Sequence, residues 1–80
     1  MSKKEKLVKR LKGIPSDFTF SELETILNQF DFEMVKTNAG SHFKWRNIKE
    51  NIVYVAPRKN PVKKIYLKQL VEILKIHFNI

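Results

Sequence analysis

The sequence predicts an α+β domain in which helices cover one face of a three-stranded antiparallel sheet. Apolar residues recur at helical spacing near both ends of the chain. Residues 42–46 instead alternate between polar and aromatic side chains, as a half-buried strand does. The connections between the central segments are short, so we expect successive strands to pair antiparallel.

Size and composition limit the protein to one domain, residues 1–80, with a net charge of +8 and no cysteine. Without disulfides or thiolate metal sites, a compact core must supply the stability. A charged N-terminus and the lack of a long apolar run argue against a signal peptide or a membrane span, so we expect a soluble, cytoplasmic protein. Repulsion among so many positive charges destabilises a folded domain, so the charge indicates an anionic partner and not solubility alone. Nucleic acid is the leading candidate for this partner, an acidic protein is the second and an anionic membrane surface is the third.

The first two helices have clear signals at their ends. Residues 3–12 place aliphatic side chains at helical spacing among lysines, and Gly13 and Pro15 end this short basic helix. Thr19 and Glu22 have capping-box spacing and predict where the second helix begins. One apolar stripe follows the second helix over three turns: Phe20, Leu23, Ile26, Leu27 and Phe30.

Three strands are expected between the second helix and the last one, at residues 32–38, 42–48 and 52–56. The third segment is rich in β-branched and aromatic residues, which favour strands. A turn at residues 38–40 joins the first two strands, and a polar reversal at residues 49–51 joins the last two. These short connections predict an antiparallel meander.

The last helix, about residues 65–78, follows a basic loop at residues 57–64 that two prolines interrupt. One face of this helix is apolar and consists of Leu67, Leu70, Val71, Leu74 and Phe78. Helix, helix, three strands, helix is an order that resembles the fold of double-stranded-RNA-binding domains, with an extra N-terminal helix. We expect the second helix and the last helix to pack on the same face of the sheet.

The alternation at residues 42–46 divides the side chains of the central strand between two faces. Phe43 and Trp45 are expected to face the helices, which leaves His42, Lys44 and Arg46 in a row facing solvent. An imidazole accepts and donates protons near neutral pH, and cations bind phosphate, so this row fits recognition or cleavage of a polyanion. The simpler interpretation is a solvated basic face without chemistry.

The motif Gly40-Ser41-His42, followed by Val55-Ala56-Pro57 and by Lys63-Lys64 before a leucine-rich helix, resembles HicA-type toxins. These are the mRNA-cleaving halves of bacterial toxin–antitoxin pairs. The resemblance covers about residues 20–80, and the basic helix at residues 3–12 lies outside it. It implies a metal-independent endoribonuclease, an mRNA interferase, with His42 as the catalytic residue and a HicB-type antitoxin that neutralises it.

Two positions depart from the family pattern. Members often carry a second histidine where this chain reads Arg58-Lys59-Asn60, and many begin the last helix with Gly-Thr where this chain has Ile65-Tyr66. These departures concern phosphate contacts more than the identity of the base.

Eight residues are candidates for contacts with single-stranded RNA: Gly40, Ser41, Lys44, Arg46, Arg58, Lys59, Lys63 and Lys64. Gly40 and Ser41 also have a simpler explanation as turn residues. Two distant histidines, scattered carboxylates and the lack of cysteine predict no metal site, and no glycine-rich loop indicates a nucleotide. We therefore expect cleavage without a cofactor.

Two other functions fit the same residues. A non-catalytic RNA-binding module would use Lys63, Lys64 and Lys68 to contact phosphates across a groove. A protein–protein adaptor would use its charge only to meet an acidic partner. Substitution of His42 distinguishes the enzyme from the module, and RNA affinity distinguishes the module from the adaptor.

Overall fold

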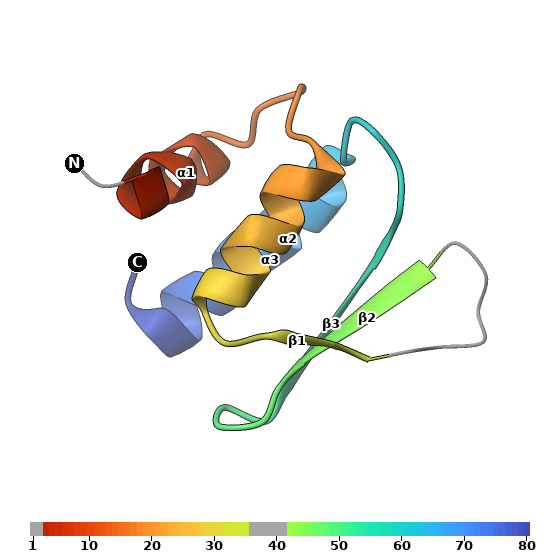
Figure 1. Cartoon of the computed structure of the whole chain (residues 1–80). Coiled ribbons are helices and arrows are strands. Elements are labelled where there is room, and N and C mark those ends of the chain that lie inside the picture. The colour runs from red at the N-terminus through yellow and green to blue at the C-terminus, as the bar shows by residue number, and fades with distance from the viewer. Residues whose placement is uncertain (1–2, 36–41) are drawn as a thin grey trace.

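A computed structural model describes residues 3–35 and 42–80 and has three helices and one three-stranded sheet (Figure 1). The elements are α1 (Lys3–Lys12), α2 (Phe20–Gln29), β1 (Glu33–Val35), β2 (His42–Asn47), β3 (Ile52–Pro57) and α3 (Lys64–Phe78). The strands pair antiparallel in the order β1-β2-β3. The predicted α+β class and the meander are therefore confirmed. Within the described residues, no helix has the length and apolar character needed to cross a bilayer.

The main difference from the sequence prediction lies at the start of the first strand, where pairing begins at Glu33 and not at Phe32. Asp31 has a φ of 63°, which reverses the chain after α2, and Phe32 then places its side chain in the core before pairing begins at Glu33. Residues 36–38 and the turn predicted at residues 38–40 lie outside the described residues. The other boundaries differ by one residue: Ile48 belongs to the turn, while Pro57 ends β3 and Lys64 begins α3.

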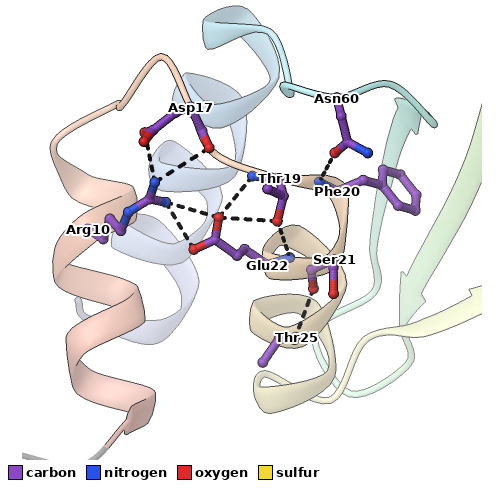
Figure 2. A network of polar contacts seen from close by, with 8 residues as sticks. All are labelled: Arg10, Asp17, Thr19, Phe20, Ser21, Glu22, Thr25 and Asn60. Carbon is purple, nitrogen blue, oxygen red and sulfur yellow. Dashed lines mark hydrogen bonds and ion pairs between the residues drawn. The ribbon is translucent and has the colours of Figure 1, made fainter.

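The start of α2 has the capping box that the sequence predicts. The Thr19 hydroxyl accepts a hydrogen bond from the Glu22 N–H at 3.1 Å, and the Thr19 N–H donates to the Glu22 carboxylate at 2.9 Å. Figure 2 shows a further partner, Arg10 of α1, whose guanidinium donates to both carboxylate oxygens of Glu22 at 3.1 and 3.0 Å and to Asp17 at 2.7 Å. The Glu22 carboxylate therefore caps α2 and also binds α1 through Arg10.

The helices α2 and α3 run in the same direction over one face of the sheet (Figure 1). At the start of α2, the Phe20 N–H donates to the side chain of Asn60, in the loop that precedes α3, at 2.7 Å. At their C-terminal ends, the rings of Phe30 and Phe78 are 5.1 Å apart between centroids. The N-terminal helix α1 packs on this pair on the side away from the sheet and buries Leu11. The domain therefore has α1, then the helix pair, then the sheet.

The core has an aromatic cluster between α2 and the sheet. Trp45 is only 1% exposed, and its ring lies 5.6 Å from Phe20 and 6.1 Å from Tyr54 between centroids. Phe43 is half-buried and lies 5.6 Å from the same Phe20 ring. The predicted inward face of the central strand is thus confirmed. The predicted stripes are buried too, except that Phe30 and Phe78, at the ends of their helices, are only half-buried.

Tyr54 joins the sheet to α3. Its hydroxyl donates a hydrogen bond of 2.9 Å to the backbone carbonyl of Tyr66. Burial raises the pKa of Tyr54 well above its usual range, and the nearby Tyr66 raises this pKa further. The neutral phenol is therefore the form that folding favours.

We expect Trp45→Ala to lower the free energy of unfolding by about 3–5 kcal/mol, because it removes the ring at the centre of the aromatic cluster. A loss of this size is a large part of the total for a small domain. Urea denaturation followed by circular dichroism measures it. The control is Val53→Ala on the exposed sheet face, which should stay within about 0.5 kcal/mol of the parent. Equal stability of the Trp45→Ala variant and the parent would contradict the burial of this ring.

We expect Tyr54→Phe to destabilise the protein by about 0.5–1.5 kcal/mol at neutral pH, because the hydrogen bond to Tyr66 is lost. The parent's advantage should shrink and then reverse as pH rises above about 10. There an unfolded tyrosine ionises, while the buried Tyr54, with its raised pKa, stays protonated. Urea denaturation of both proteins from neutral to alkaline pH tests this. A constant difference between them would show that Tyr54 ionises as readily in the folded protein as in the unfolded one.

Candidate nucleic-acid interface

The outward side chains of β2 lie in the middle of the sheet face opposite α2 and α3. His42 and Arg46 are exposed and Lys44 is half-buried. They alternate with the inward-facing Phe43 and Trp45, so the predicted division of the strand between two faces is confirmed. This places the candidate site on the central strand, where it has neighbours on both sides.

The register explains why Lys44 is half-buried. Val35 of β1 and Val55 of β3 are its two cross-strand partners. Both valines are exposed for their residue type, at 37% and 44%. A lysine stem lies readily along such apolar neighbours while its ammonium stays in water. The open face therefore has a cationic row flanked by aliphatic side chains.

The two ends of this row differ in charge. At one end, Arg46 lies opposite Glu33 of β1, and these two residues also line a hollow of about 250 Å³ together with Asp31. Lys49 lines the same hollow, so the two carboxylates balance two cations and leave no excess positive charge for phosphate at this end. Cross-strand register is a property of the folded sheet, so local periodicity did not predict this arrangement.

At the other end of the row, His42 lies opposite Pro57, the last residue of β3. Arg58 and Lys59 follow Pro57 directly and are both exposed. The sheet therefore brings its histidine and two of the predicted cations to the same end. Asp31 and Glu33 lie at the opposite end of the row, beside Arg46.

The start of α3 adds two further predicted cations. Lys63 is the N-cap residue but makes no capping hydrogen bond through its side chain, and Lys64 is the first helical residue. The first turn of α3 has no acidic residue. Cations near the positive end of a helix dipole are unfavourable by about 0.3–1 kcal/mol each. A bound anion would offset this unfavourable electrostatic free energy.

The structure thus brings together some of the predicted residues and leaves others apart. Lys44 and Arg46 lie on the open face of the sheet. Arg58 and Lys59 lie in the loop after β3. Lys63 and Lys64 lie at the start of α3. Gly40 and Ser41 lie outside the described residues. The second histidine, His77, is exposed in the last turn of α3, far along the chain from β2. Within residues 3–35 and 42–80, no three His, Cys, Asp or Glu side chains form a group that could hold a metal ion.

Sequence reasoning missed Asn47, which fixes the far end of β2. Its side chain is buried, donates to the Phe30 carbonyl at 2.7 Å and accepts from the Glu50 N–H at 2.9 Å. These bonds connect the end of α2 to the turn between β2 and β3. The only local signal was the inward position that Asn47 takes when the alternation of Phe43 and Trp45 is continued.

Comparison of the chain with protein-family models, with curated proteins and with solved structures finds no match. The function is therefore inferred from the residues described above.

We expect the affinity for single-stranded RNA to fall as salt rises, with a slope of log affinity against log salt near −3.5. This value corresponds to about five phosphate contacts. We expect about five of the following six cations to meet phosphates: Lys44, Arg46, Arg58, Lys59, Lys63 and Lys64. Replacing Arg58 and Lys59 by glutamine should bring the slope to about −2, while Lys75→Gln on the outer face of α3 should leave it unchanged. Fluorescence anisotropy over a salt series measures the slope, and a value near zero would contradict a polyanion partner.

Proposed function

We propose that the protein is an RNA-cleaving toxin of the HicA type, an endoribonuclease that uses His42 as its general base. The observation that carries this proposal is the position of His42, exposed on the central strand and at the end of the sheet where Arg58 and Lys59 leave β3. In this position, the imidazole and the two cations that follow β3 would be available to the same phosphate group of a bound RNA. The proposal agrees with the motif Gly40-Ser41-His42 in the sequence.

The chemistry needs little machinery because RNA carries its own nucleophile. His42 accepts the proton of the 2′-hydroxyl, whose oxygen attacks the adjacent phosphorus, and the bond from phosphorus to the 5′-oxygen breaks. The products are a 2′,3′-cyclic phosphate and a 5′-hydroxyl, with water supplying the proton to the leaving oxygen. Lys44 and the cations after β3 stabilise the negative charge that develops on the phosphate oxygens.

The fold supports an RNA substrate. The elements α2, β1, β2, β3 and α3 have the order of a double-stranded-RNA-binding domain, and both helices lie in the same direction on one sheet face (Figure 1). Under this proposal, α1 is an addition to the double-stranded-RNA-binding fold. The open sheet face is available to a partner. A single strand of RNA bound along this face would place its phosphates near Lys44 and the cations that follow β3.

The same face is suited to a neutralising protein. We propose a HicB-type antitoxin whose acidic surface covers the cations and whose apolar residues meet the exposed valines, Val35, Val53 and Val55. Covering the face would exclude RNA from His42 without any change in the fold. Charge complementarity of this kind increases the rate of association as well as its specificity.

A second candidate function, a non-catalytic RNA-binding module, is favoured by the start of α3. Lys63 and Lys64 lie beside the positive end of the helix dipole, and Lys68 follows one turn later. Basic residues in such a position reach phosphates of a duplex across a groove. This function needs no histidine, so the two candidates make opposite predictions for variants of His42.

We expect His42→Ala to abolish growth inhibition when the protein is expressed alone. The variant lacks the proton acceptor, and general-base catalysis contributes about 10²–10⁴-fold. RNA affinity should change little, because Lys44 and the other cations remain. Folding should also be retained, because His42 is exposed. The matched control is His77→Ala, which removes the other histidine and should leave toxicity intact.

The products provide an independent test of the mechanism. RNA cut by the purified protein should carry 2′,3′-cyclic phosphate ends, which mass spectrometry identifies. Ends with a 5′-phosphate would mean that water is the nucleophile and would exclude the proposed mechanism. Full toxicity of His42→Ala would refute the role of this residue. If the parent binds RNA but cuts none after removal of any partner, the binding module is the correct function.

A further inference from the structure

A second surface lies at the end of the molecule where α1 meets the C-terminal end of the helix pair. Here a groove of about 480 Å³ runs between α1 and the last residues of the described chain. Val8, Phe30 and Ile80 provide its apolar lining, and all three are half-buried. The volume is within the range of sites that hold a small ligand or a few side chains.

The polar lining of this groove is mostly basic. Lys4, Lys9 and Lys12 of α1 contribute three positive charges, and Glu5 contributes one negative charge, so the side chains of the lining have a net charge of +2. All four residues are exposed. Cations beside an apolar floor are complementary to a ligand that carries both carboxylates and aliphatic groups.

The Phe30 ring in the groove already contacts two other side chains. The Lys4 ammonium lies 5.6 Å from the centroid of the Phe30 ring, and the Phe78 ring meets the same ring edge-on at 5.1 Å. A nucleobase would need an open ring face on which to stack. This arrangement favours a peptide over RNA as the occupant, because an aliphatic side chain needs only the apolar contact that Val8 and Ile80 offer.

We propose that this groove is a docking site for an acidic, amphipathic helix of a partner protein. The aliphatic side chains of that helix lie on Val8, Phe30 and Ile80, and its carboxylates pair with Lys9 and Lys12. A helix-in-groove contact of this kind is read through side chains spaced three or four residues apart.

The groove and the open sheet face are separate surfaces. Figure 1 shows α1 on one side of the helix pair and the sheet on the other. A partner helix in the groove therefore leaves His42 and Lys44 accessible, and the domain can hold the partner and RNA together. The proposed docking site does not depend on whether the protein cleaves RNA.

The experiment is a selection from a displayed library of random peptides about 15 residues long, roughly four helical turns. Selection on the parent is compared with selection on Lys9→Glu/Lys12→Glu. The matched control is Lys6→Glu, which makes the same charge change on the same helix outside the groove. Enriched peptides are then synthesised, and their affinity is measured by fluorescence anisotropy.

We expect the enriched peptides to be acidic and to carry aliphatic residues three or four positions apart. Their affinity should fall at least about tenfold for Lys9→Glu/Lys12→Glu and about threefold for Val8→Thr, and should change less than about twofold for Lys6→Glu. A single-stranded RNA oligonucleotide and the Lys44→Gln substitution should leave peptide binding unchanged.

Three results would overturn the proposal. One is the enrichment of no peptide whose binding depends on Lys9 and Lys12. Another is an equal loss of affinity for Lys6→Glu, which would indicate attraction to the overall charge. The third is displacement of the peptide by RNA, which would make the groove a nucleic-acid site.

Discussion

Burial of Trp45 against Phe20 of α2 and Tyr54 of β3 is the interaction on which the rest of the structure depends. Side chains of a strand alternate between faces, so placing this ring in the core also turns Lys44 and Arg46 outward. A slip of one residue in β2 would bury those cations and expose the aromatic rings. In a chain of 80 residues without cysteine, the same contact supports the fold and determines which side chains the open sheet face presents.

A second constraint is the use of one carboxylate for two purposes. Glu22 caps α2 together with Thr19 and also binds Arg10 of α1. The position of α1 is therefore linked to the first turn of α2, and α1 also supplies five of the seven residues that line the groove. Arg10 and Glu22 are only partly buried, so this link is modest in energy and acts mainly by fixing geometry.

The net charge of +8 is distributed unevenly over the molecule. Arg58 and Lys59 lie at the His42 end of the sheet, Lys63 and Lys64 lie at the start of α3, and further lysines lie along α1. Glu33 and Asp31 lower the potential at the opposite end of the open face. Like charges held this close destabilise a small domain, and anionic partners on both surfaces would relieve that repulsion. The two proposed interactions follow from this one electrostatic property.

Local sequence determined the helices to within a residue, the capping box of Thr19 and Glu22, and the two faces of β2, because periodicity and caps depend only on near neighbours. It placed Phe32 in a strand, whereas the chain reversal at Asp31 puts that ring in the core. Only the tertiary structure decided which residue Arg10 binds, that Glu33 faces Arg46, and that His42 lies beside the end of β3. These arrangements depend on register and packing between segments far apart in the chain, which no local pattern encodes.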